Sequence, residues 1–220
     1  MKKSLVLSTK KLSFGQMQRL THAGCAVVDY NAIEAVSVPF EIPQKPSHWV
    51  FSSQNAVRAV LNKNPKVWSG KTVICVGEKT KKLLEKNGVK VKKSAKNIQF
   101  LVDFIQKECK NDSFLHICGN RKLADFSLGM QEANIEHTEI VVYKTQLIER
   151  TQKPEPDGIL FFSPSGVESY LLKNSLGKSW CFCIGNTTAA AVRPHSECVS
   201  APKTPDIELV IAQAAKHFRS

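Results

Sequence analysis

The stretch LFFSPSGVESYLL, Leu160–Leu172, decides how the rest of the chain is interpreted. An apolar run stops at Ser-Pro-Ser-Gly and resumes with helical spacing, which is the pattern of a buried strand that turns into a helix. The stretch VFSSQNAVRAVL, Val50–Leu61, makes the same transition earlier in the chain. Two such turns indicate an internal repeat of one supersecondary unit.

A second pair of turns supports the repeat. ICVGEKT, Ile74–Thr80, follows the first Ser-rich turn, and CIGNTT, Cys183–Thr188, follows the second. Each half thus holds a strand, a Ser-rich turn, a helix, a strand, a Gly-x-x-Thr turn and a helix. Strand–helix alternation of this kind continues along the chain and predicts an α/β fold, with parallel sheets covered by helices on both faces.

Two long extended stretches interrupt the alternation, Cys25–Pro39 and Ile135–Glu149. Both are β-rich, contain no helix and exceed the usual strand length of about 5 or 6 residues. We expect each to run from one domain to another as a two-stranded β connector. The sequence thus predicts a discontinuous α/β domain, residues 1–37 plus 143–220, and an inserted α/β domain, residues 38–142.

The composition is that of a globular protein, since 42% of the 220 residues are apolar and 23% are charged. No apolar stretch approaches the roughly 20 residues of a membrane helix, and the first residues do not resemble a signal peptide. We therefore expect a cytoplasmic protein without a membrane partner. The seven cysteines form no C-x-x-C pair and mostly lie in apolar runs, so we expect reduced core thiols rather than disulfides or metal ligands.

The net charge of +12 predicts an anionic partner. Much of the excess lies between Leu61 and Lys96, which holds eleven lysines and no arginine. A run of this kind is either a solvated lysine face or an electrostatic footprint for RNA. Because the run has no arginine and only one aromatic residue, Trp68, it is weak evidence for nucleic acid.

The repeated turns have the chemistry of anion-binding sites. In open α/β sheets, ligands bind outside the carboxyl ends of the strands, where the next helix presents unpaired N–H groups and the positive end of its dipole. Ser, Asn and Thr at a helix start can face a ligand, and glycine lets a ligand approach the backbone. The same residues are ordinary helix caps, so the structural role is favoured for each turn taken alone.

Other kinds of chemistry find little support in the sequence. There is no nucleophile elbow, because Ser163 stands where the first glycine would be, and there is no Walker A, dinucleotide-binding or H-E-x-x-H motif. His116, in FLHICG, is interpreted as a core or rim histidine. Tyr143, in IVVYKT on the second long stretch, is either a packed strand tyrosine or a phenol that can protonate a departing hydroxyl.

Together, the paired FSSQNAV and FSPSGV turns, the paired VGEKT and IGNTT turns, and HICGNRKLADFSLGMQEANIEHTEIVVYKT resemble the uroporphyrinogen-III synthase family. The resemblance spans nearly the whole chain. It implies two flavodoxin-like α/β domains, one of them discontinuous, with the active site between them. It also implies a cyclising hydro-lyase of tetrapyrrole and heme biosynthesis that uses no cofactor and no metal.

The resemblance further implies the reaction. Hydroxymethylbilane loses its hydroxyl, the resulting azafulvene cation closes on the substituted carbon of ring D to a spiro intermediate, and fragmentation and reclosure invert that ring. It implies a monomer that receives its substrate by transient handover from the upstream deaminase, with no nucleic-acid partner. The alternatives left open by the residues are a two-domain small-anion binding protein and a basic RNA-binding module.

Site residues follow from the family motifs. The acid of the V-Y-x-T motif falls on Tyr143. Substrate contacts fall on the repeated turns and on the Gly-Asn-Arg turn before a helix, namely Ser53, Asn55, Gly77, Thr80, Gly119, Arg121, Ser163, Pro164, Ser165, Gly166, Gly185, Asn186, Thr187 and Thr188. The chain departs from many relatives at Ser8-Thr9-Lys10, where they have Thr-Arg-Pro. Lys10 keeps the charge without the bidentate fork of arginine and is included as a candidate for binding.

Overall fold

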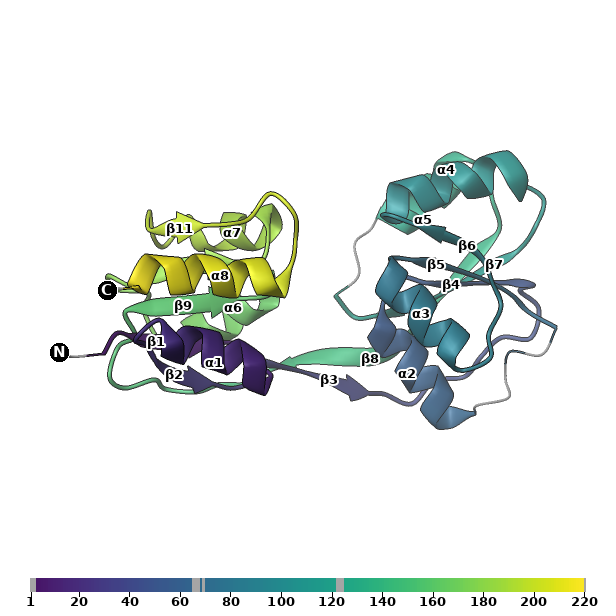
Figure 1. The fold of residues 1–220 in the computed structure, drawn as a ribbon. Coiled ribbons are helices and arrows are strands. Elements are labelled where there is room, and N and C mark those ends of the chain that lie inside the picture. Colours follow the sequence, from purple (N-terminus) through teal and green to yellow (C-terminus); the bar gives the residue numbers. More distant parts are fainter. Residues whose placement is uncertain (1–2, 65–67, 69, 122–124, 220) are drawn as a thin grey trace. The chain divides into compact units, whose positions relative to one another are not determined.

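The structure, a computed structural model, describes residues 3–64, 68, 70–121 and 125–219. Part of the lysine-rich run and the start of the helix expected after Gly119 lie outside the described residues. The chain forms two compact units (Figure 1). The terminal unit comprises Met1–Glu34 and Gln146–Ser220, and the inserted unit comprises Ala35–Thr145.

The terminal unit is built on a five-stranded sheet with the order β11-β10-β9-β1-β2, in which all neighbouring strands are parallel. Its strands are β1 (Leu5–Ser8), β2 (Ala26–Asp29), β9 (Gly158–Phe161), β10 (Trp180–Cys183) and β11 (Val199–Ser200). Its helices are α1 (Phe14–His22), α6 (Pro164–Leu171), α7 (Asn186–Val192) and α8 (Ile207–Phe218).

Helices cover both faces of this sheet (Figure 1). On one face, Leu20 of α1 and Ile211 of α8 pack against Leu160 of β9. On the other face, Val167 of α6 and Val192 of α7 belong to a second buried cluster with strand residues. Successive residues of each strand thus serve different cores, which explains why β9 is buried along its whole length.

The inserted unit is built on a six-stranded sheet with the order β3-β8-β7-β4-β5-β6. The pairs from β8 to β6 are parallel. Its strands are β3 (Ile33–Ser37), β4 (His48–Phe51), β5 (Thr72–Val76), β6 (Val91–Ala95), β7 (Phe114–Gly119) and β8 (His137–Leu147). Its helices are α2 (Gln54–Lys63), α3 (Glu78–Lys86), α4 (Ile98–Glu108) and α5 (Asp125–Glu132).

The inserted unit also has two cores. Trp49 and Phe51 of β4 face a cluster that includes residues of α2 and α3, whereas Val50 faces a cluster that includes residues of α4 and α5. Figure 1 shows the two helix pairs on opposite faces of the sheet. The predicted class, a mixed α/β fold dominated by parallel sheets, is confirmed.

The two long stretches differ from each other. Ile135–Glu149 contains the single eleven-residue strand β8, as expected. The prediction of continuous extension over Cys25–Pro39 is wrong, because β2 ends at Asp29 and β3 begins at Ile33. The break has a physical cause, since the amides of Tyr30 and Ala32 donate to the carbonyls of Ser8 and Thr9 and hold the chain against the end of β1.

Candidate active site

The turn after β4 places a hydroxyl beside the phenol of β8. Ser53 is the N-cap of α2, and its Oγ accepts a hydrogen bond from the amide of Asn55 at 3.1 Å. The hydroxyl of Tyr143 donates to the same Oγ at 3.0 Å. Two residues that sequence analysis nominated separately, Ser53 and Tyr143, are therefore in direct contact.

Gly119 makes room for the Tyr143 ring. The two residues are paired between β7 and β8, next to an irregularity in the register. A Cβ at position 119 would lie 2.4 Å from Cζ of Tyr143, which no side chain could tolerate without displacing the ring. Asn120 adds support, because its amide donates to the Tyr143 carbonyl at 3.2 Å. Gly119 is thus a positioning residue for the phenol.

A cavity of about 490 Å³ opens beside this contact, within the range of small-molecule sites. Its lining includes Ser53, Gly119, Arg121 and Tyr143 from the predicted set. Lys96 also lines the cavity, so two cationic side chains, Lys96 and Arg121, lie beside the hydroxyl groups. The combination suits a ligand that carries carboxylates.

Sequence analysis missed a hydrogen-bonded chain at the same cavity. Ser52 Oγ lies 2.9 Å from Nε2 of His116, and Nδ1 of that imidazole lies 2.8 Å from Oε1 of Glu139. Both Ser52 and His116 line the cavity, and His116 is only 1% exposed. The imidazole therefore connects a cavity hydroxyl to a carboxylate. This is the arrangement in which histidine can take up or release a proton.

The register of the parallel strands creates that chain of contacts. His116 of β7 is the partner of Glu139 of β8 and of Val50 of β4. Nothing in FLHICG alone indicates which strand lies alongside it, so His116 was interpreted as a core or rim residue. The signal available in the sequence was its position three residues before Gly119, near the carboxyl end of a strand.

Other predicted residues of the inserted unit lie near helix starts. Gly77 precedes α3 with a φ of +84°, a left-handed conformation that favours glycine. Thr80 is 5% exposed, and its amide donates to the carbonyl of Gly77. Asn55 is half-buried in the first turn of α2. The residues described as lining the cavity do not include these three.

The remaining candidates gather at the carboxyl ends of β1, β9 and β10 in the terminal unit. Ser163 caps α6, where its Oγ accepts from the Gly166 amide at 3.0 Å and lies 3.0 Å from Oγ of Ser165. Pro164 occupies the first turn of the helix. Thr9 approaches the same turn, since a Cβ at Gly166 would lie 3.5 Å from its Oγ1. Lys10 follows and is exposed.

The turn after β10 differs from its neighbour. Gly185 is the N-cap of α7 and provides no side-chain cap, so the helix begins without a hydroxyl on its first amides. Asn186 and Thr187 are exposed, whereas Thr188 is buried. The predicted set thus falls into two groups, one on each unit, and each group lies at the carboxyl ends of parallel strands.

Comparison with known proteins agrees with this fold. The model of the family described as uroporphyrinogen-III synthase HemD matches residues 17–212. The uroporphyrinogen-III synthetase structure from Helicobacter pylori 26695 aligns over 100% of both chains, with a TM-score of 0.73 and 18% identity. A mutant uroporphyrinogen III synthase from the extremely thermophilic bacterium Thermus thermophilus aligns over 98% of both chains, with a TM-score of 0.70 and 12% identity.

No curated protein matches the chain. The fold and the family match define a class, the cyclising lyases of tetrapyrrole biosynthesis. Within that class, the chain belongs to the uroporphyrinogen-III synthase family. No observation on the described residues favours the binding-protein or RNA-binding alternatives.

Proposed function

We propose that the chain converts hydroxymethylbilane to uroporphyrinogen III at the cavity of the inserted unit, with Tyr143 as the acid. The observation that carries the proposal is the phenol of Tyr143, which lines the cavity and is held against Ser53 at 3.0 Å. A neutral phenol can donate a proton to the departing hydroxyl, and Ser53 keeps that phenol in place. Loss of water leaves the azafulvene cation.

The overall reaction needs one proton delivered and one removed, because only water is lost. The cation closes on the substituted carbon of ring D, the spiro intermediate fragments, and reclosure inverts the ring. The carbon of ring D that forms the new bond to the cation in the last closure then gives up its proton, which restores the pyrrole. We propose that His116 accepts this proton through the hydroxyl of Ser52, with Glu139 compensating the charge of the imidazolium.

Cationic groups and helix starts suit the carboxylates of the substrate. Lys96 and Arg121 line the cavity, and we propose that they bind acetate or propionate groups. The turns at Ser163–Gly166 and at Gly185–Thr188 would bind further carboxylates through backbone amides and hydroxyls. These contacts would hold the flexible tetrapyrrole in a folded conformation, which favours inversion over simple closure.

The test of function is isomer analysis. Hydroxymethylbilane is generated in situ by its upstream deaminase, this protein is added, and the oxidised porphyrins are separated by chromatography. We expect the product to shift from the type I to the type III isomer. Type I alone, from folded protein with fresh substrate, would overturn the proposal.

We also propose finer points of organisation. The two units are interpreted as the family's two domains, and the strand order of the terminal unit, 2-1-3-4-5 in its own numbering, supports a flavodoxin-like form there.

No helix among the described residues is long and apolar enough to cross a membrane. We propose a cytoplasmic monomer that takes its substrate from the upstream deaminase. Light scattering with and without the deaminase tests both the monomer and the handover.

A further inference from the structure

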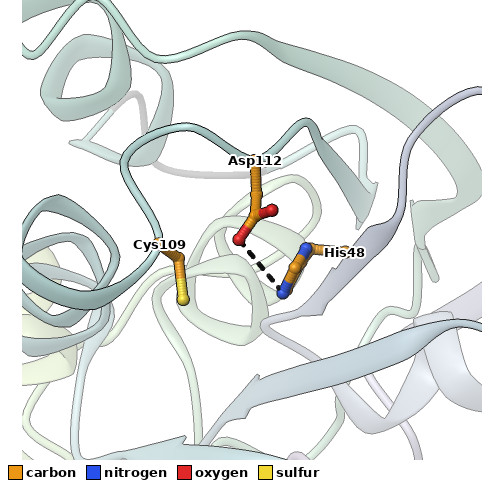
Figure 2. Close-up of side chains that lie close together, drawn as sticks. All are labelled: His48, Cys109 and Asp112. Atoms are coloured by element: carbon orange, nitrogen blue, oxygen red, sulfur yellow. Dashed lines mark ion pairs between the residues drawn. The ribbon is translucent and has the colours of Figure 1, made fainter.

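Three side chains with ligand chemistry converge at the amino end of β4, whereas the cavity residue Ser52 follows its carboxyl end. His48 is the first residue of β4, Cys109 is the C-cap of α4, and Asp112 lies in the turn before β7. Figure 2 shows the imidazole, the thiol and the carboxylate turned toward one another. No step of the proposed reaction uses them.

The spacing of these groups suits a small metal ion. Nε2 of His48 lies 3.6 Å from Oδ2 of Asp112, and one ligand atom from each of the three residues lies within 4.8 Å of the others. Tetrahedral zinc with bonds of about 2.0 to 2.3 Å places its ligand atoms about 3.5 Å apart. A small inward movement of the side chains is enough to reach that geometry.

The imidazole of His48 has a buried nitrogen without a hydrogen-bond partner. His48 is 6% exposed, and its Nε2 makes no hydrogen bond, although most buried polar atoms are paired. Nδ1 lies 3.1 Å from Oγ of Ser47. In the tautomer with a proton on Nδ1, that contact is a donated hydrogen bond, and the lone pair of Nε2 faces Cys109 and Asp112. Metal-binding histidines are commonly oriented in this way.

A second cluster provides a contrast. His116, Cys118 and Glu139 also bring ligand atoms within 4.8 Å of one another. Both ring nitrogens of His116 are already engaged, one with Ser52 and one with Glu139. That imidazole has no nitrogen lone pair directed at an empty position, so the His48 cluster is the better candidate for a metal.

Charge and softness of the donors favour zinc. A thiolate at Cys109 and a carboxylate at Asp112 balance a divalent ion, and thiolate with imidazole selects zinc over magnesium or calcium. Nζ of Lys92 lies 3.5 Å from the Cys109 sulfur. Lys92 is exposed, so its ammonium group can turn to solvent when a cation binds.

We propose that His48, Cys109 and Asp112 bind Zn²⁺. The ion would tie the start of β4 to the turn between α4 and β7. The side chain of Asp112 is 41% exposed, which provides a path for entry and a fourth position for water. The site is structural and separate from the cavity, and under this proposal Cys109 departs from the expectation that the cysteines are reduced core thiols rather than metal ligands.

Metal titration of the full chain tests the proposal. The protein is treated with a chelator, dialysed and titrated with Zn²⁺, and then with Co²⁺ as a spectroscopic probe. We expect one ion per chain, a cobalt–thiolate charge-transfer band, and a higher melting temperature with zinc. Cys109→Ser should abolish the band, and Asp112→Asn, at a partly exposed position, should weaken binding at least about tenfold.

The control is Cys118→Ser, which alters the second cluster and should leave the cobalt band unchanged. Absence of a thiolate band in the wild type would overturn the proposal. So would unaltered binding in Cys109→Ser, or loss of binding in Cys118→Ser alone. Since these readouts do not involve turnover, they are independent of the isomer assay.

Discussion

At the scale of single residues, the site depends on how neighbours orient a few polar groups. Tyr143 faces the cavity because Gly119 has no side chain and because Oγ of Ser53 accepts a hydrogen bond from its hydroxyl. The pairing of His116 with Ser52 and Glu139 depends equally on its neighbours. A substitution that removes the reacting group but keeps the shape of the side chain therefore distinguishes a catalytic role from a packing role.

Replacing Tyr143 with phenylalanine tests the acid. The ring would still pack on Gly119, but no proton could be donated, so we expect kcat to fall about a hundredfold and KM to change little. Some activity should remain, because the folded substrate retains part of its reactivity. Fixed-time porphyrin assays over a range of substrate concentrations measure kcat and KM.

Tyr170→Phe is the matched control, because Tyr170 is a buried phenol in the core of the terminal unit. It should leave turnover unchanged. If Tyr143→Phe also kept full turnover, Tyr143 would be removed from the mechanism.

Replacing His116 with glutamine tests the proton acceptor. Glutamine fills much of the same space and can still bond to Ser52, but it cannot exchange a proton, so we expect kcat to fall at least about tenfold. The comparison variant is His137→Gln, because His137 also lies 2.8 Å from a serine hydroxyl, that of Ser127, but is not among the cavity residues. Equal loss in both variants, with lower melting temperatures, would indicate packing rather than catalysis.

At the scale of elements, the strand–turn–helix units could be predicted from local pattern. Ser53 and Ser163 cap their helices as their positions after apolar runs indicated. The split of Cys25–Pro39 could not be predicted, because it depends on amides that bond to the end of β1. The contact of His116 with Glu139 requires the register of β7 on β8, which involves residues distant in sequence.

Asp29, at the end of β2, offers a test of how one element is anchored. Its carboxylate accepts from Nζ of Lys11 at 2.8 Å and from the amide of Leu12 at 2.9 Å. Burial alone would raise the pKa of Asp29, but these partners outweigh it and hold the pKa below its ordinary value of 3.8. The unfolded chain then takes up this proton at higher pH than the folded chain. The stabilisation is thus present above about pH 4 and is lost as the pH falls further.

Urea unfolding between about pH 3 and pH 7 checks this expectation. Asp29→Asn should lower the free energy of unfolding at neutral pH and should make its decline toward acid shallower. Glu132→Gln, at an exposed position in α5, should leave both unchanged. Identical acid slopes in Asp29→Asn and the wild type would contradict the role given to this carboxylate.

At the scale of the whole molecule, the two units share a construction but not a strand order. In its own numbering, the five parallel strands of the inserted unit run 3-2-1-4-5, which matches the first five positions of the Rossmann order 3-2-1-4-5-6, and β3 is added at the edge. The repeated turns in the sequence predicted similar local units, and local units do not determine the order in which strands pair.

Net charge is also a property of the whole molecule, and the full chain carries a formal net charge of +12.

A protein with a net positive charge should bind a polycarboxylate less tightly as the salt concentration rises. Screening shortens the reach of the protein's field, so we expect KM for hydroxymethylbilane to rise at least about threefold between about 0.05 and 0.5 M NaCl. The chemical step takes place in a cavity with fixed partners, so kcat should change little. Steady-state kinetics across the salt series, with the isomer ratio measured at each point, tests both statements.

Two lysine variants connect this effect to the cavity. Lys96→Gln removes a charge from the cavity lining and should raise KM at low salt while making KM less sensitive to added salt. Lys178→Gln removes an exposed charge just before β10, at the other end of that strand from Gly185, and should behave as the wild type. A KM that did not respond to salt in any of the three proteins would mean that shape and uncharged donors, rather than the positive field, recognise the substrate.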